Sequence, residues 1–87
     1  MKRLRIIGLV NGGATPFDNQ WLVSYDPDYH WPDGTYDGGD LRTSPDERDA
    51  RQFIDVKAAV DYWRQGHGLR ADGKPNRPLT AFNVEIV

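Results

Sequence analysis

Residues 26–40, DPDYHWPDGTYDGGD, gather carboxylates and aromatic rings in one short stretch. The stretch holds five aspartates, four rings if His30 is counted, three glycines and no Lys or Arg. Three kinds of structure use such residues: a cation site, a surface that recognises a basic partner, and a loop whose aspartates cap its own turns. We favour the second and the third.

A metal site has little support in this stretch. A calcium loop needs oxygen donors at positions 1, 3 and 5, glycine at position 6 and Glu at position 12. Residues 33–38 match the first half of this pattern, but Ser44 stands where the Glu should be. A transition metal would need more ligands than His30 and carboxylates, and His67 is distant in sequence. We therefore expect no metal and no cofactor.

Hydrolytic catalysis also lacks a recognisable motif. Ser24 and Ser44 are the only serines, and neither lies in a Gly-x-Ser-x-Gly elbow. A glycosidase needs a deep cleft between two carboxylates, for which 87 residues leave little room. We therefore expect that the chain is not an enzyme, and a metal-dependent enzyme is the second alternative.

Basic residues form two groups that could contact phosphates. One group lies in residues 2–5 and the other in residues 67–78. The net charge of −2 counts against a dedicated nucleic-acid binder, so nucleic acid is not the expected partner. A nucleic-acid-associated module is the first alternative. The residues that would carry it are Arg3, Arg5, Arg70, Lys74 and Arg77.

Recognition of another protein is the function that residues 25–40 favour. Tyr and Trp are enriched at binding hot spots because each offers a large rigid ring with a polar tip. The surrounding carboxylates favour a basic partner. The competing explanation is that Tyr25 and Trp31 fold back to complete a small core, because a small sheet with one helix leaves its second face uncovered. A homodimer that uses this open face is a third possibility. The residues expected to contact a protein partner are Asp28, Tyr29, Trp31, Asp33, Tyr36 and Asp37.

The chain that must position these residues is short. Its 87 residues predict a single domain, 1–87, with a small core. It contains no Cys, which excludes disulfides and zinc–thiolate sites and agrees with a cytoplasmic location. Its apolar runs are far shorter than a membrane span, so we expect no membrane partner.

Hydropathy patterns predict the elements. Alternation favours strands in residues 2–10, 20–25 and 79–87, and a short further strand that ends near Thr43. Trp21, Val23 and Tyr25 are expected to share one face of the second strand.

The main helix is predicted over residues 55–66. Its apolar stripe is expected to be Val56, Ala59, Val60 and Trp63. A shorter helix is expected to begin at Ser44, as its N-cap. The order β-β-(β)-α-β predicts an α+β fold: a small antiparallel sheet of three to four strands with the helix packed on one face, in two layers.

Several motifs resemble a group of small uncharacterised proteins that bacteriophages, prophages and their bacterial hosts encode. The motifs are VSYDP, TSPDERDARQF, VKAAVDYW and KPNRPLTAFNVEIV. They reproduce a Tyr-Asp-Pro strand end, a Thr-x-x-Asp helix start, an Ala-Arg-x-Phe step and a helix that ends in an aromatic residue. The resemblance covers residues 20–87 and implies an accessory role in a phage or prophage setting. It supplies no catalytic residues. The acidic stretch quoted above, residues 26–40, is not part of the shared pattern.

Overall fold

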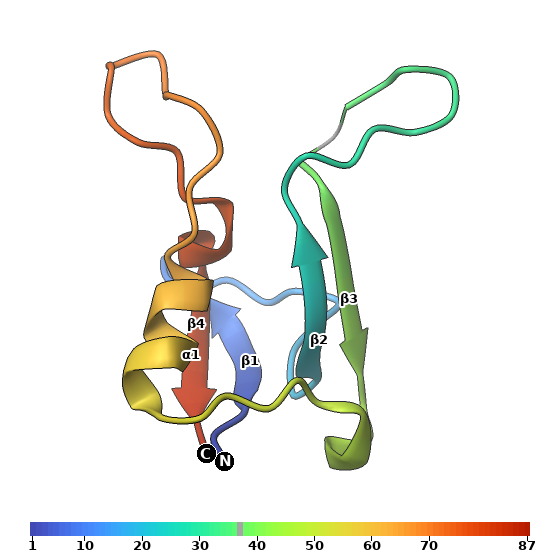
Figure 1. Cartoon of the computed structure of the whole chain (residues 1–87), viewed down its shortest axis with the longest axis vertical. Helices are drawn as coiled ribbons and strands as arrows, with labels where there is room; N and C mark the ends of the chain where they lie inside the picture. The colour runs from blue at the N-terminus through green and yellow to red at the C-terminus, as the bar shows by residue number, and fades with distance from the viewer. Residues whose placement is uncertain (37) are drawn as a thin grey trace.

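A computed structural model describes residues 1–36 and 38–87 of the chain. It contains a four-stranded antiparallel sheet and one main helix, so the predicted α+β fold is confirmed (Figure 1). The strands lie in the order β3-β2-β1-β4. Their bounds are β1 (Leu4–Leu9), β2 (Trp21–Asp26), β3 (Asp40–Ser44) and β4 (Phe82–Ile86). The helix α1 spans Val56–Trp63, and two 3-10 turns, η1 and η2, span Glu47–Asp49 and Pro78–Ala81.

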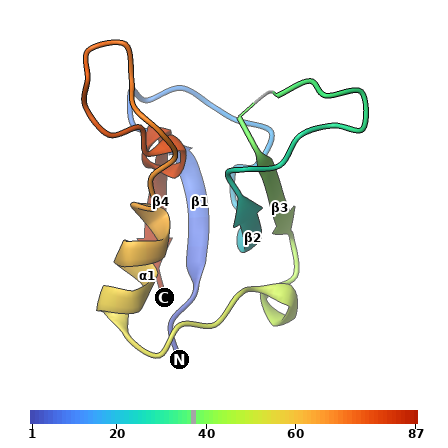
Figure 2. The same cartoon turned by 45° about the horizontal axis from the view of Figure 1, so that its top comes forward.

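The sheet consists of two strand pairs. β1 pairs with β4 and β2 pairs with β3, each over several residues. Among the described residues, the register between β1 and β2 is one pair, Arg5 with Trp21. The two termini lie together at one end of the molecule, and the β2–β3 and α1–η2 connections project from the other end (Figures 1 and 2). Backbone hydrogen bonds of 2.9 Å between Arg3 and Val87 close the end that holds the termini.

Helix α1 covers one face of the sheet. Ala59 is fully buried against Leu4, Leu22 and Phe53, and this cluster is the centre of the core. The partly buried side chains packed around it are Leu41, Ala58, Tyr62, Trp63, Val84 and Ile86. Within the strand predicted over residues 79–87, Val84 and Ile86 pack on this core, whereas Thr80 lies in η2.

The predicted helix stripe is rotated. Val56 is half exposed, while Ala58 and Tyr62 join Ala59 and Trp63 on the buried side. Apolar spacing does not predict this rotation, because Tyr62 combines a ring with a polar hydroxyl. That hydroxyl accepts a hydrogen bond of 2.8 Å from the backbone N–H of Tyr25, which fixes the helix against β2.

Two further local predictions were wrong. A register shift between Leu22 and Ser24 breaks the strand alternation, so Leu22 and Tyr25 are both buried and Val23 is only partly buried. The short helix is a single 3-10 turn whose N-cap is Asp46, not Ser44. The Ser44 hydroxyl instead accepts from the Asp46 N–H and donates to the carboxylate of Asp49.

Across the residues that the structure describes, no helix has the length and apolar character that crossing a bilayer requires.

Candidate binding site

The acidic loop, residues 26–40, begins at the end of β2 and ends at the start of β3 (Figure 1). Its two ends meet at Gly39, where φ is +100°. A Cβ at this position would lie 2.5 Å from the carbonyl oxygen of Asp26 and 2.9 Å from Cα of Pro27. Only glycine accepts both this backbone angle and this close approach.

Several carboxylates of the acidic loop stabilise its own turns. Asp26 accepts a hydrogen bond of 3.0 Å from the N–H of Asp28. Asp33 accepts one of 2.9 Å from the N–H of Thr35 and a second from the Thr35 hydroxyl. These bonds hold the pKa of Asp33 below its usual range, the hydroxyl bond contributing most. Asp26 and Asp33 therefore act as turn formers, which agrees with the expectation that aspartates of this stretch cap its own turns.

The rings of the loop divide between the core and the surface. Tyr25, which precedes the loop, is 7% exposed, and its hydroxyl donates to the carbonyl of Gly38. Trp31 is 48% exposed and packs edge-to-face on Tyr29, with ring centroids 5.5 Å apart. Tyr36 is 37% exposed and donates a hydrogen bond of 2.8 Å to the carbonyl of Pro27. The core explanation therefore holds for Tyr25 but not for Trp31.

A tight turn holds Trp31 in place. Its backbone N–H donates to the carbonyl of Thr35 at 2.9 Å, and its carbonyl accepts from Gly34 at 2.8 Å. A ring presented on a hydrogen-bonded turn loses less entropy on binding than one on a free segment. Asp37, which was also expected to contact a partner, lies outside the described residues.

The basic loop, residues 67–78, connects α1 to η2 and touches the acidic loop through His67. Nδ1 of His67 lies 2.7 Å from a carboxylate oxygen of Asp28. The His67 ring also packs on Tyr36, with centroids 5.2 Å apart, and Tyr36 in turn packs on His30 at 4.9 Å. Asp28 and Tyr36, both predicted site residues, thus meet at a contact between the two loops.

The residues of the nucleic-acid alternative do not form one surface. Arg3 lies beside the termini, 3.8 Å from Glu47, and Arg5 pairs with Glu85 at 2.9 Å. Arg70 lies in the loop at the opposite end, 3.4 Å from Asp72 (Figure 1). Lys74 and Arg77 belong to the same loop. Nucleic-acid binding stays a prediction, and it would need two separate contact areas.

The sheet face away from α1 carries a packed polar cluster. The guanidinium of Arg5 lies 5.6 Å from the ring centroid of Trp21 and pairs with Glu85 on the neighbouring strand. Trp21 is buried, with 9% of its surface exposed. A homodimer through this face stays a prediction.

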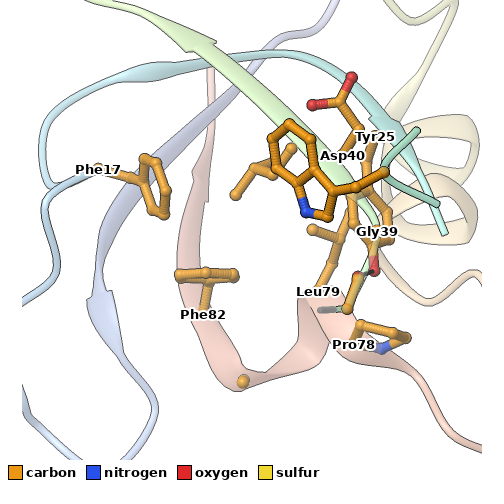
Figure 3. Close-up of a pocket in the computed structure, with 11 residues that line it drawn as sticks. Phe17, Tyr25, Gly39, Asp40, Pro78, Leu79 and Phe82 are labelled. Atoms are coloured by element: carbon orange, nitrogen blue, oxygen red, sulfur yellow. Dashed lines mark hydrogen bonds between the residues drawn. The ribbon is translucent and has the colours of Figure 1, made fainter. Parts of the chain in front are cut away.

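A pocket of about 560 Å³ opens between the acidic loop and η2. Figure 3 shows Phe17 and Phe82 on one side of it, and Tyr25, Gly39 and Asp40 on the other. Trp31 also lines the pocket, which gives it four aromatic rings from four segments of the chain. The full lining is Phe17, Tyr25, Trp31, Gly38, Gly39, Asp40, Leu41, Pro78, Leu79, Ala81 and Phe82.

The sequence does not indicate the part of this site that comes from outside the acidic loop. Phe17, Phe82 and His67 are distant from the loop in sequence, and each stands in an unremarkable local pattern. The only signal was topological, since an antiparallel hairpin places its loop at one end of the sheet. The position of His67 and η2 at the same end depends on tertiary contacts, which the sequence does not reveal.

Within residues 1–36 and 38–87, no three His, Cys, Asp or Glu side chains are grouped so that they could hold a metal ion. Comparison with protein-family models, with curated proteins and with solved structures found no match to this chain.

Proposed function

We propose that the protein is a non-enzymatic binding protein that recognises a basic protein partner through its acidic loop. Tyr29, Trp31 and Tyr36 supply the contact area, and Asp28, Asp33 and Asp37 supply the negative charge. The resemblance of residues 20–87 to phage and prophage proteins favours an accessory role in that setting. The absence of Cys favours the cytoplasm as its location.

The observation that carries the proposal is the placement of Trp31. Trp31 is 48% exposed although it lines a pocket with other aromatic side chains, and its turn is closed by two backbone hydrogen bonds. Large rings fixed at a surface are the typical anchors of protein interfaces. Residues 6–41 add six aspartates and no Lys or Arg, so the field around the ring attracts cations.

A random peptide display library, selected on the immobilised protein, tests the proposal. We expect the retained peptides to be enriched in Lys and Arg, and their binding to weaken as salt is raised. Trp31→Ala should lower the affinity of such a peptide about ten-fold or more, because hot-spot rings contribute at least that much. Its melting temperature should stay close to that of the wild type.

Ile54→Ala is the matched control. Ile54 is 78% exposed and follows Phe53, whose backbone pairs with Lys2 near the termini. The substitution removes exposed apolar area at the other end of the molecule and should leave peptide affinity unchanged. Retained peptides without excess positive charge, or a Trp31→Ala variant that binds as tightly as the wild type, would overturn the proposal.

A further inference from the structure

The pocket beside the acidic loop has the composition of a site for an organic cation. Phe17, Tyr25, Trp31 and Phe82 bring four aromatic rings to its wall. Phe17 and Phe82 lie edge-to-face with centroids 6.0 Å apart, so their planes are nearly perpendicular. An aromatic ring attracts a cation at its face, and several rings in different orientations can surround one cationic group.

The chain around the pocket carries negative charge. Residues 17–40, which supply three of the four rings, contain six aspartates and no Lys or Arg. Asp40 lines the pocket itself, and its carboxylate is held by Arg42 at 3.0 Å. The other wall, Pro78–Ala81, has no charged residue, and Arg77 precedes it. The excess of aspartates in the segment that supplies three of the four rings therefore favours a cation over an anion.

The volume of the pocket suits an inserted side chain. At about 560 Å³ it falls within the range of small-ligand pockets, and it opens to solvent next to the half-exposed ring of Trp31. A partner that covers Trp31 would bring its own side chains to this opening. Because the partner proposed above is basic, those side chains include Lys and Arg.

We propose that this pocket accepts the cationic head of a lysine or arginine side chain of the partner, between the faces of Trp31, Phe17 and Phe82. This inference rests on the proposed function and specifies the chemistry that the site recognises. The aliphatic stem of the side chain would pack on Leu79 and Pro78, while its charged head lies among the rings. The pocket thereby adds selectivity for a positive charge to the general attraction of the acidic loop.

Two pairs of capped amino acids test the inference on the wild-type protein. Acetyl-lysine amide is compared with acetyl-norleucine amide, which has a similar stem without the ammonium group. Acetyl-arginine amide is compared with acetyl-citrulline amide, its uncharged isostere. Binding is followed by NMR titration of the aromatic resonances. We expect the cationic member of at least one pair to bind about five-fold more tightly or better. Equal binding within both pairs, or no binding by any probe, would overturn the inference.

Phe82→Leu removes one ring while keeping apolar volume. It should reduce the affinity of the preferred cationic probe several-fold, and Phe17→Leu provides an independent second variant if the first fails to fold. Ile54→Ala is the control, because Ile54 is 78% exposed and does not line the pocket. A loss in Ile54→Ala equal to that in Phe82→Leu would show that the pocket is not the binding site.

These outcomes separate the inference from the proposed function. If Trp31→Ala abolishes peptide binding while the charged and neutral probes bind alike, the acidic loop recognises a partner but the pocket does not select a cation. If the probes show charge selectivity while the peptide library yields no basic sequences, the proposed function fails and the pocket remains a site for an organic cation.

Discussion

The hydroxyl of Tyr25 donates a hydrogen bond to the carbonyl of Gly38 across the base of the acidic loop. Burial, and after it the charges of Tyr36, Asp26 and Asp28 nearby, raises the pKa of Tyr25 to about 12. The phenol must therefore stay protonated for this end of the sheet to remain closed.

This pKa predicts a loss of stability at alkaline pH. The pKa of Tyr25 is about 12 in the folded protein and 10.0 for an unperturbed tyrosine, so the unfolded chain releases the proton first. Stability is then fully present below pH 10 and falls as pH rises towards 12, because the folded state binds more protons than the unfolded state. We expect a decrease of up to about 3 kcal/mol in the free energy of unfolding from this residue.

Urea unfolding at a series of pH values checks this prediction, with Tyr25→Phe as the comparison. The variant loses the hydrogen bond to Gly38 and should be less stable near neutral pH. Its stability should fall less steeply than that of the wild type between pH 10 and 12. Parallel curves for the two proteins would contradict the assignment.

The residue scale also shows what the sequence could reveal about the site. The aspartates were recognisable as turn formers, because an Asp side chain commonly accepts a hydrogen bond from the backbone N–H two residues later. Asp33 and Thr35 form such a bond. The sequence did not indicate that Tyr25 is buried and Trp31 is half exposed. Both are rings among aspartates, and only the packing of distant segments decides which of them is buried.

At the scale of elements, a side chain of helix α1 supplies a hydrogen-bond partner that strand β2 lacks on one side. Because β1 pairs with β2 at one position among the described residues, the backbone of Tyr25 lacks a strand partner on that side. The hydroxyl of Tyr62 takes this place: it accepts from the Tyr25 N–H at 2.8 Å and lies 3.4 Å from the Tyr25 carbonyl oxygen. The helix thereby joins the two strand pairs of the sheet.

Tyr62→Phe tests this link with a minimal change. It removes the hydroxyl and keeps the ring, which packs on Phe53 and lies under the guanidinium of Arg51 at 4.6 Å. The Tyr25 N–H would lose its partner, so we expect about 1–3 kcal/mol of destabilisation. The amide of Tyr25 should also exchange with solvent faster, which hydrogen-exchange NMR would detect. Unchanged exchange at Tyr25 would contradict the proposed link.

The strands and the helix were predictable because each carries its own periodicity. Val84 and Ile86 alternate as a half-buried strand should, and Asp55, the first residue of the predicted helix, is its N-cap, accepting from the N–H of Ala58 at 2.8 Å. The rotation of the helix was not predictable, since Tyr62 acts through a hydroxyl bond rather than through apolarity. The register shift between Leu22 and Ser24 was likewise not predictable from the sequence, because it depends on how β2 pairs with β3.

The whole molecule places its two long loops at the end away from the termini (Figures 1 and 2). Their side chains meet where His67 contacts Asp28 and Tyr36. This contact lies between the acidic loop, which carries the proposed anchor Trp31, and the connection that leads into η2, the other wall of the pocket. We therefore expect the distance between the two loops to affect the width of the pocket.

We expect Asp28→Ala to let the loops separate. The Asp28 carboxylate is largely exposed, so its pair with His67 contributes no more than about 1 kcal/mol, which changes the ratio of closed to open arrangements about five-fold. The chain contains no Cys, so spin labels can be attached at Pro32→Cys and Leu69→Cys alone. Pulsed electron paramagnetic resonance should give a longer and broader distribution of distances between the two labels in Asp28→Ala.

Asp61→Ala is the control. It breaks the exposed pair with Lys57 on α1 and should leave the distribution unchanged. If the two variants behave alike, the pair between Asp28 and His67 does not hold the loops together, and the stacking of Tyr36 on His67 would have to do so instead.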